Sequence, residues 1–422
     1  MNELIYWIWL SGATTPGTPT FKKLIEAYPG AKEIYEADIY EISKYIGART
    51  SDRAALKDKD LTRAQEIFNY CVKYDIGILA YSDERFPVSL REIPTPPVLL
   101  YYRGKLPDFN KYFSLAIVGT RSLSDYGRRA AFVSSYEMSR AGALIVSGMA
   151  MGIDGVAHAG ALAAEGVTVA VIGCGINVCF PEGHKTLARE IVKGGCVLSE
   201  FAPGTPPSRT TFPKRNRIIS GLCAATLVIE GRERSGSLIT ARHAREQGRA
   251  VYALPGNVGS KNSEATNLLI KNGAKLFTSS DDIINDFEDV YRGALNRFLL
   301  PEEVNIDIKS VLTNYKVIAV APSDDIFTPP KQQKKAKKSE TSAEEASSPL
   351  NEERRAFFEP PTSFDKKALE IYKKIPQNDG CLIEELVDSD TSMRQVMQSL
   401  LKLEMGHFIE MFPGERVKRK SK

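Results

Sequence analysis

Short apolar runs alternate with amphipathic stretches through the middle of the chain. From Leu115 onward, the runs LAIVG, ALIVSG, VTVAVIG, CVLSE, ATLVIEG and AVYALPG each have the length of a buried strand. Stretches with helical character, such as DYGRRAAFVSSYEMSRAGA and SLITARHAREQGR, separate most of them. Nearly continuous apolar strands that alternate with helices are typical of a parallel sheet with helices on both faces. The pattern therefore predicts an α/β core with a doubly wound parallel sheet.

The segments on either side of this core have different patterns. The predicted Rossmann-like core covers residues 79–292, and residues 1–78 consist of short helical stretches separated by turn signals, which predicts a small all-α module. Residues 293–363 include the charged segment KQQKKAKKSETSAEEASSP and are poor in large apolar side chains, so we expect a largely disordered linker. Residues 364–422 have the order of three helices, a β-wing and a basic tail, which suits a winged-helix domain.

The composition is that of an ordinary globular protein, with 43% hydrophobic and 26% charged residues among 422. Because the net charge is only +4, a nucleic-acid function must depend on where the cations lie. No apolar run reaches the roughly 18 residues of a membrane span, and the first residues, MNELIYWIWLSGATT, lack the basic region of a signal peptide. The six cysteines, from Cys71 to Cys381, do not form a disulfide framework. We therefore expect a cytoplasmic protein.

Small, polar and cationic residues follow several of the apolar runs. In an open parallel sheet, ligands bind at the carboxyl ends of the strands, where helix N-termini present free amides. Glycines there let an anion approach the backbone closely, although turn geometry alone also produces glycine-rich loops. The sequence predicts an anion-binding edge formed by Gly119-Thr120-Arg121-Ser122, Ser147-Gly148-Met149-Ala150-Met151-Gly152-Ile153-Asp154, Gly173-Cys174-Gly175 and Gly231-Arg232-Glu233-Arg234-Ser235-Gly236-Ser237.

Four cations surround one aromatic ring in the segment SRTTFPKRNR, residues 208–217, which we interpret as a loop. Single strands of nucleic acid are held by cations along the backbone and by flat rings under the bases. The alternative is a solvated basic turn whose ring, Phe212, lies in the core. Both interpretations stay open on this segment alone.

Six sequence blocks carry a resemblance to a known family. In chain order they are VGTRSLSDYGR, SGMAMGIDGVAHAGAL, FPEGHKTL, FPKRNRIISGL, SGSLITARHA and VYALPGNVGS. Over about residues 80–290 the set resembles the DNA-processing protein A family, DprA, also called Smf. The resemblance implies a sterile-alpha-motif-like or helix-hairpin-helix module before the core and a winged helix after it. It also implies a protein that binds single-stranded DNA, protects incoming strands during natural transformation and loads the RecA recombinase onto them.

The resemblance also assigns roles to individual residues. It implies that Arg121 contacts a backbone phosphate, that Arg209 adds a cation to the DNA pocket, and that Phe212 stacks on a base or wedges against it. Lys185 lies in a block where family members carry further cations. Together with the small residues at the sheet edge, the expected DNA-binding set is Gly119, Thr120, Arg121, Ser147, Gly148, Lys185, Arg209, Phe212, Arg215, Asn216, Arg217, Ser235, Gly236 and Ser237.

Two cofactor patterns are incomplete in this sequence. The segment GCGINV begins like a dinucleotide-binding fingerprint, but Val178 stands at the third glycine and the segment follows the third strand rather than the first. The spacing of the candidate metal ligands fits no zinc template; they are Cys174, Cys179, His184 and Cys196. We expect neither a cofactor nor a metal.

An enzymatic function is the main alternative to DNA binding. Nucleotide phosphoribohydrolases of the lysine-decarboxylase-like type share a related Rossmann-like fold, a glycine-rich loop and arginines. Their PGGxGTxxE loop supplies a catalytic glutamate, whereas Arg242 and His243 stand there in RSGSLITARHA. Glycosidic hydrolysis needs a carboxylate near the reacting carbon, and His158 has no evident nucleophile as a partner. We therefore expect no enzymatic activity.

A role as a partner-binding adaptor is the third possibility. The segment NLLIKNGAKLF, residues 267–277, resembles the helix and strand through which family members dimerise, although packing in the core explains its apolar residues nearly as well. The recognition helix expected in the winged-helix domain, TSMRQVMQSLLKLEM, offers only Arg394 and Lys402 as cations. This favours a protein-interaction or regulatory role over duplex recognition for that domain.

Overall fold

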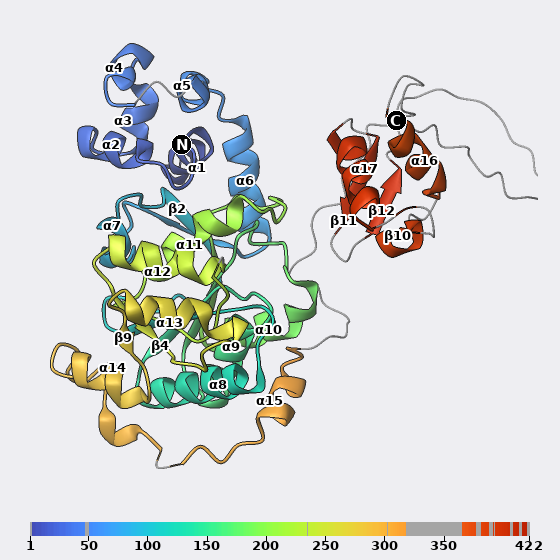
Figure 1. The fold of residues 1–422 in the computed structure, drawn as a ribbon. Helices are drawn as coiled ribbons and strands as arrows, with labels where there is room; N and C mark the ends of the chain where they lie inside the picture. Colours follow the sequence, from blue (N-terminus) through green and yellow to red (C-terminus); the bar gives the residue numbers. More distant parts are fainter. Residues whose placement is uncertain are drawn as a thin grey trace, which may run out of the picture. The chain divides into compact units, whose positions relative to one another are not determined.

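The computed structural model describes residues 2–46, 50–233, 235–301, 303–317, 365–376, 381–387, 391, 393–405, 408–412 and 416–419 (Figure 1). These residues fall into two compact units, with the division after residue 333. The first unit holds the N-terminal helices and the α/β core. The second holds the C-terminal helices and a small sheet.

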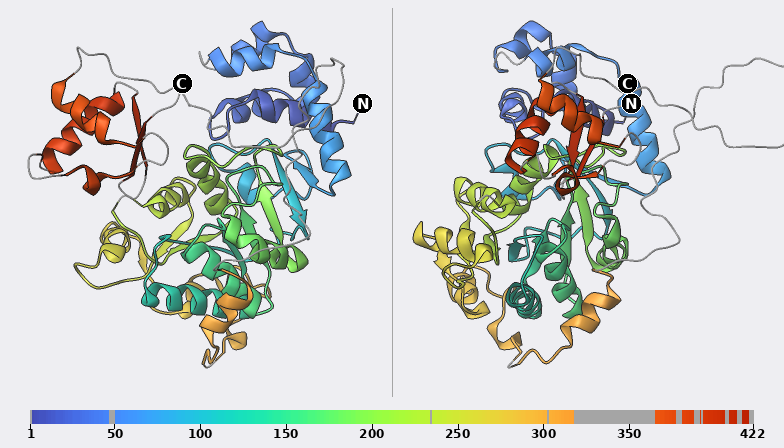
Figure 2. Two further views of the ribbon diagram at one scale, coloured as in Figure 1. Left: turned by 90° about the vertical axis from the view of Figure 1, so that its right-hand side faces the viewer. Right: turned by 45° about the vertical axis from the view of Figure 1, so that its right-hand side comes forward.

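The N-terminal helices gather beside β1 and β2 at one end of the core (Figures 1 and 2). Helix α1 is apolar around most of its circumference because α3, α5, α6 and the sheet edge surround it. The buried carboxylate of Asp52 accepts hydrogen bonds from the hydroxyls of Thr15 and Thr20, which fixes the turn between α1 and α2. The helices are α1 (Leu4–Ala13), α2 (Thr20–Ala27), α3 (Ala31–Glu36), α4 (Ile39–Ser43), α5 (Thr50–Lys57) and α6 (Thr62–Lys73).

The core is built on one sheet with the strand order β1-β2-β6-β5-β4-β3-β7-β8-β9. From β6 to β9 all neighbouring strands are parallel, while β1 pairs antiparallel with β2, and β2 pairs antiparallel with β6. The prediction of an α/β fold with a mostly parallel sheet is confirmed. The strands are β1 (Gly77–Ala80), β2 (Leu99–Gly104), β3 (Ser114–Val118), β4 (Leu144–Ser147), β5 (Thr168–Val171), β6 (Cys196–Ser199), β7 (Ala225–Val228), β8 (Ala250–Ala253) and β9 (Lys275–Leu276).

Both faces of the sheet are covered, which explains why its central strands are apolar at most positions. In β3, Leu115 and Ile117 belong to one apolar cluster, while Ala116 and Val118 belong to the other. Residues of α8 (Asp125–Arg140), α9 (Ile153–Ala163) and α10 (Lys185–Gly194) complete the first cluster. Residues of α11 (Thr211–Gly221), α12 (Gly236–Glu246) and α13 (Glu264–Lys271) complete the second.

The chain reverses its direction of travel across the sheet between β3 and β7. It passes outward from β3 through β4 and β5 to β6, and then returns to β7 on the other side of β3. The connections after β3 and β7 therefore diverge, which leaves a crevice at the carboxyl ends of these strands. Shorter elements connect the main ones: α7 (Val88–Arg91), η1 (Glu182–His184), η2 (Lys261–Ser263), α14 (Ser280–Phe287) and η3 (Arg297–Leu299).

The first unit continues past the predicted end of the core at residue 292. Helix α15 (Ile308–Asn314) contacts α9, and the side chains of Leu312 and Val317 are buried. Residues 293–317 thus contain packed structure where the sequence predicts a linker, because Leu312 and Val317 add to the apolar cluster over α9. The rest of the predicted linker, residues 318–363, lies outside the described residues.

The second unit has its own small core. The described elements are arranged as helix, strand, helix and hairpin, with the sheet order β10-β12-β11. Ile371, Val396, Leu400 and Val417 are buried among them. This order is compatible with the winged helix expected from the sequence, which stays a prediction. The elements are α16 (Lys366–Lys374), β10 (Cys381–Leu382), η4 (Ile383–Leu386), α17 (Met393–Met405), β11 (Ile409–Phe412) and β12 (Arg416–Arg419).

None of the helices in the described ranges is both long enough and apolar enough to span a bilayer. The longest, α8, has 16 residues and carries charged side chains on its surface. The core helices instead bury one face against the sheet, as expected for layers on an α/β sheet.

The packing of α15 leads to a prediction about stability. We expect Leu312→Ala to lower the free energy of unfolding by about 2 kcal/mol, since it leaves a cavity against α9. The exposed Leu299 supplies the matched control, and Leu299→Ala should change stability by less than about 0.5 kcal/mol. Urea unfolding monitored by circular dichroism measures both variants. Equal effects would show that α15 adds nothing to the core.

Candidate nucleic-acid binding site

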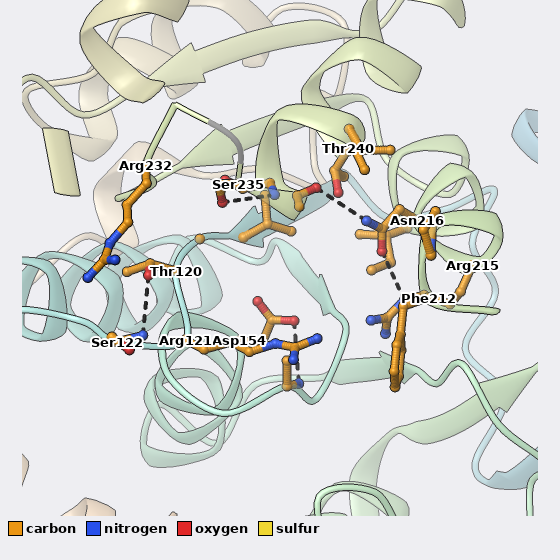
Figure 3. Close-up of a pocket in the computed structure, with 18 of the residues that line it drawn as sticks. Thr120, Arg121, Ser122, Asp154, Phe212, Arg215, Asn216, Arg232, Ser235 and Thr240 are labelled. Carbon is orange, nitrogen blue, oxygen red and sulfur yellow. Dashed lines mark hydrogen bonds between the residues drawn. The ribbon is translucent and has the colours of Figure 1, made fainter. Parts of the chain in front are cut away.

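A cavity of about 580 Å³ lies at the carboxyl ends of β3 and β7, in the crevice where the strand order reverses (Figure 3). Its walls come from the connections after β3 and β7 and from the first turns of α11 and α12. The floor includes Asp154 at the start of α9. Segments far apart in the sequence thus meet at one edge of the sheet, as the sequence predicts for the anion-binding edge.

The cavity has an excess of positive charge. Four guanidinium groups line it, from Arg121, Arg209, Arg215 and Arg232, against the single carboxylate of Asp154 among the described lining residues. Arg121, Arg209 and Arg232 are exposed, and within the described ranges none of them forms an ion pair. Their charges are therefore available to an anionic ligand.

Asp154 is buried and is held by the backbone. One carboxylate oxygen accepts hydrogen bonds from the amides of Gly148, at 3.1 Å, and Ala150, at 3.4 Å. Burial raises the pKa of this carboxyl, while the nearby Arg215 and the two amides act in the opposite direction. Asp154 therefore shapes the loop after β4 rather than offering a free carboxylate to a ligand.

Arg215 lines the cavity, as the expected DNA-binding set requires, but its guanidinium is bonded to the backbone beneath α11. Its buried guanidinium donates to the carbonyl of Gly148, at 2.7 Å, and to that of Val171. Burial lowers its pKa to about 10, so the group remains charged at neutral pH. A Cβ atom on Gly148 would lie 2.4 Å from this guanidinium, so the glycine is needed for close packing.

Phe212 lies at the cavity wall and not in the core. It stands in the first turn of α11, is half-buried, and belongs to neither apolar cluster of the core. The guanidinium of Arg121 lies 5.6 Å from the ring centroid, within range of a cation–π contact. A Cβ atom on Gly173 would lie 2.7 Å from the Phe212 ring, which explains the glycine after β5. The core-packing alternative for Phe212 is therefore wrong.

The residues that the sequence interpretation placed in a loop begin a helix. The hydroxyl of Ser208 accepts hydrogen bonds from the amides of Thr210, at 3.3 Å, and Thr211, at 3.2 Å, which holds the turn that leads into α11. Pro213 is tolerated because an amide in the first turn needs no partner within the helix. Arg209 therefore lies just before the helix, and Phe212 lies in its first turn.

The start of α12 supplies the polar wall that the sequence predicts. Ser235 caps this helix by accepting a hydrogen bond from the amide of Ser237 at 3.2 Å. A Cβ atom on Gly236 would meet nothing within 4 Å, so the backbone there is open to a ligand. Asn216 donates to the carbonyl of Gly236 at 3.4 Å and so connects α11 with α12. Ser235, Gly236 and Ser237 all line the cavity.

The turn after β3 forms the opposite wall. Gly119 and Thr120 line the cavity together with Arg121. The Thr120 amide donates to the carbonyl of Glu230 at 2.8 Å, and the Thr120 hydroxyl accepts from the amide of Ser122 at 3.2 Å. These bonds hold the turn against the end of β7 and set the position of Arg121 (Figure 3).

Four predicted contacts are placed differently from the prediction. Ser147 is buried, and its hydroxyl donates to the carbonyl of Ile117 at 2.6 Å, so it connects β4 to the neighbouring strand β3. The amide of Gly148 is taken by Asp154, and Gly148 lines a smaller neighbouring cavity instead of the main one. Lys185 lies at the start of α10, pairs with Glu182 at 3.2 Å and does not line the cavity.

Arg217 is the fourth and the clearest correction. Its side chain is only 3% exposed, and its guanidinium forms an ion pair with Glu200 at 2.5 Å. The Arg217 guanidinium lies near Gly17 of the N-terminal helices, and Arg217 is absent from the cavity lining. The reason is helical periodicity, because residues two apart in α11 point to different sides.

The DNA-binding set predicted from the sequence does not include Arg232 or Asp154. Arg232 comes directly after the apolar run ATLVIEG and falls in the loop that the sequence singles out, so its position was a usable signal. Asp154 follows the small residues after β4, but a carboxylate there gives no local sign that it is buried. Only the fold brings it beside Arg215.

The candidate metal ligands do not form a site. The six cysteines are free thiols, and no group of three or more His, Cys, Asp or Glu side chains in the described part of the chain is placed to hold a metal ion. His158 is fully buried, and its Nδ1 lies 2.7 Å from the Thr168 hydroxyl. Burial lowers the pKa of this imidazole to about 3, as expected for a structural histidine in the core.

Comparison with known proteins identifies the family. The model of the family described as DNA recombination-mediator protein A matches residues 77–288, which hold the sheet and every wall of the cavity. The chain belongs to this family. The resemblance expected from the six sequence blocks is thereby confirmed.

Individual relatives agree with this membership. The DNA processing protein DprA of Streptococcus pneumoniae is 44% identical over 208 residues, which are 49% of this chain and 72% of the relative. Protein Smf of Escherichia coli is 43% identical over 270 residues, or 60% of this chain and 72% of the relative. The X-ray structure of DprA from Streptococcus pneumoniae superposes with a TM-score of 0.60 at 35% identity, covering 68% of this chain and 99% of that one.

The position of Arg217 leads to a prediction. We expect Arg217→Ala to lower the free energy of unfolding by roughly 3–5 kcal/mol, because it leaves the Glu200 carboxylate buried without a counter-charge. The double variant Arg217→Met with Glu200→Leu should recover most of this loss, since it removes both charges. Urea unfolding measures the free energy of unfolding of wild type, Arg217→Ala and the double variant. A stability near wild type for Arg217→Ala would contradict the buried ion pair and return Arg217 to the candidate DNA contacts.

Proposed function

We propose that this chain binds single-stranded DNA in the cavity between β3 and β7, protects incoming strands during natural transformation and loads the RecA recombinase onto them. The observation that carries the proposal is that three exposed arginines, which form no ion pair with any residue that the structure describes, meet one aromatic ring in a single cavity. Membership of the recombination-mediator family supports it. A cytoplasmic location belongs to the same proposal, because the recombinase acts on DNA there.

The cations and the helix start suit a phosphate backbone. Exposed guanidinium groups neutralise phosphates and release their counterions, which dominates the affinity of most proteins for nucleic acids. The open backbone at Gly236 and the first turn of α12 add hydrogen-bond donors and a positive helix end. Arg121 and Arg232 lie on connections after neighbouring strands, so a backbone that crosses the crevice can contact both.

The ring of Phe212 favours an unpaired strand over a duplex. Bases in a duplex stack on one another and expose only their edges, whereas an unpaired base can place its face on an aromatic ring. Phe212 lines the same cavity as Arg121 and Arg209, so one nucleotide can meet both a ring and a cation. This arrangement is typical of sites that hold single strands without strong sequence preference.

We infer that the site performs no covalent chemistry. Asp154 is the single carboxylate among the described lining residues, and backbone amides engage it from below. Arg242 and His243, which stand where a phosphoribohydrolase has its acid, lie in α12 and interact with Glu246. A glycosidic bond in this cavity would therefore lack a free carboxylate to stabilise its transition state.

We propose that the chain forms a homodimer through residues 267–277. This region comprises most of α13 and the strand β9, which is the last strand of the sheet. Leu269 packs into the core, while Leu268 and Leu276 are exposed at this edge. An unpaired strand edge with apolar neighbours suits pairing with a second copy. Two cavities on one dimer would raise the affinity for a single strand through avidity.

The terminal modules complete the proposal. We infer that the helices before the core form a sterile-alpha-motif-like or helix-hairpin-helix module and that the second unit is a winged helix. In that unit, Lys402 of α17 pairs with Asp365 at 2.7 Å, which reduces the free charge on its expected recognition helix. This supports a protein-interaction or regulatory role there.

The arginines make the first test of the proposed function. Arg121→Ala and Arg209→Ala should each weaken single-strand binding and reduce the slope of log affinity against log salt by about one, because each removes one phosphate neutralisation. Fluorescence anisotropy with a labelled oligothymidylate at several salt concentrations measures both quantities. Arg292→Ala is the control, since Arg292 is exposed, pairs with Asp289 and does not line the cavity. Unchanged affinity and slope in both variants would place the DNA elsewhere.

Phe212 makes the second test. Phe212→Ala should cost about 1–3 kcal/mol of binding free energy and leave the salt slope unchanged, because it removes a stacking surface but no charge. Phe212→Tyr should retain most of the affinity. The same titrations measure both variants, and wild-type affinity for Phe212→Ala would exclude a base contact at this ring.

A further inference from the structure

Three apolar side chains stand together at the sheet edge beside the arginine cavity. Met151, Phe180 and Phe212 line a smaller cavity of about 80 Å³, which they share with Arg121. Met151 is 44% exposed and Phe180 is 42% exposed, so both present apolar surface to solvent. The family blocks contain these residues, but the proposed function uses only Phe212.

The fold sets these side chains side by side. Met151 follows β4, Phe180 follows β5 and Phe212 follows β6, and these three strands are consecutive neighbours in the sheet. The rings of Phe180 and Phe212 have their centroids 5.6 Å apart and their planes tilted by 33°. Arg121 follows β3, the next strand of the same row. The loops after β4, β5 and β6 thus bring an apolar group together, and Arg121 borders it on the loop after β3.

Exposed apolar side chains that are scattered singly need no explanation, but a contiguous group beside a binding cavity marks an interaction surface. The group is composed of two rings and a thioether, the polarisable side chains that pack well against flat aromatic faces. Because this apolar group lies next to the arginines of the proposed phosphate site, the two surfaces together suit a ligand that has anionic groups beside flat apolar rings.

We propose that Met151 and Phe180 extend the base-contacting surface of Phe212, so that consecutive unpaired bases lie over the loops after β4, β5 and β6. The phosphates of the same nucleotides lie toward Arg121 and Arg209. This inference rests on the proposed function and assigns the apolar side of the site to the bases of the DNA. It also gives the site a reason to reject duplex DNA, in which base faces are not accessible.

The test compares two ligands that differ only in their bases. One is an oligothymidylate, and the other is a strand of equal length with abasic sugars at every position, which keeps all the phosphates. Phe180→Ala should weaken binding of the oligothymidylate roughly fivefold or more, while binding of the abasic strand stays as in wild type. Its salt slope should not change, because no charge is removed. Phe180→Tyr should restore the affinity for the oligothymidylate, and Met151→Ala should reproduce the direction of the Phe180→Ala effect.

Phe298 supplies the matched control. It is a phenylalanine of the same unit, is 91% exposed and lines neither cavity. Phe298→Ala should therefore bind both ligands as wild type does. Thermal unfolding of Phe180→Ala should remain cooperative and close to wild type, because the side chain is 42% exposed and the ring pair with Phe212 contributes only about 0.5–1.5 kcal/mol.

The outcomes separate this inference from the proposed function. The base-contacting surface is overturned if Phe180→Ala weakens the binding of both ligands equally or of neither. In that case the proposed function still stands if Arg121→Ala reduces the slope of log affinity against log salt. A wild-type protein that binds neither ligand overturns the proposed function itself. A selective loss of recombinase recruitment in Phe180→Ala, with unchanged binding of both ligands, would assign the apolar group to a protein partner and overturn the inference.

Discussion

The candidate site depends on the buried guanidinium of Arg215. Its bonds to the carbonyls of Gly148 and Val171 join α11 to the ends of two neighbouring strands, β4 and β5. A charge buried in this way is stable only while its partners remain in place, so the helix has little freedom to shift. The position of Phe212, one turn earlier in α11, follows from this constraint. The aromatic wall of the cavity and part of its positive charge therefore have one structural origin.

The α/β fold could be predicted because the sheet is covered on both faces. Strands such as β3 are then apolar from Leu115 to Val118 on both faces, and the helices between the strands show as amphipathic stretches. The packing of α15 could not be predicted in the same way. Leu312 contacts α9 across a long stretch of sequence, and a short helix with few apolar residues gives no local sign of such a contact.

The site residues could be predicted where their position directly after a parallel strand places them at the sheet edge. Arg121, Arg209, Phe212 and the start of α12 meet in one cavity because all of them follow parallel strands. The error at Arg217 came from interpreting residues 208–217 as a loop, whereas Thr211–Gly221 form the helix α11. In a loop Arg215 and Arg217 could face one ligand, but in α11 they lie roughly 200° apart around the axis. The glycines after the strands were ambiguous for a related reason, because close packing against Arg215 or Phe212 requires glycine as strictly as an approaching phosphate does.

The apolar character of α1 has a practical consequence. The chain contains two tryptophans, Trp7 and Trp9, and both lie in this helix, where the Trp9 indole donates to the carbonyl of Asp58 at 2.9 Å. Neither lines the cavity at the sheet edge. The tryptophan emission, excited at wavelengths that the 17 tyrosines do not absorb, therefore reports on the N-terminal helices alone. A change in this emission on addition of an oligonucleotide would show, without any attached dye, that DNA binding alters the environment of the N-terminal helices.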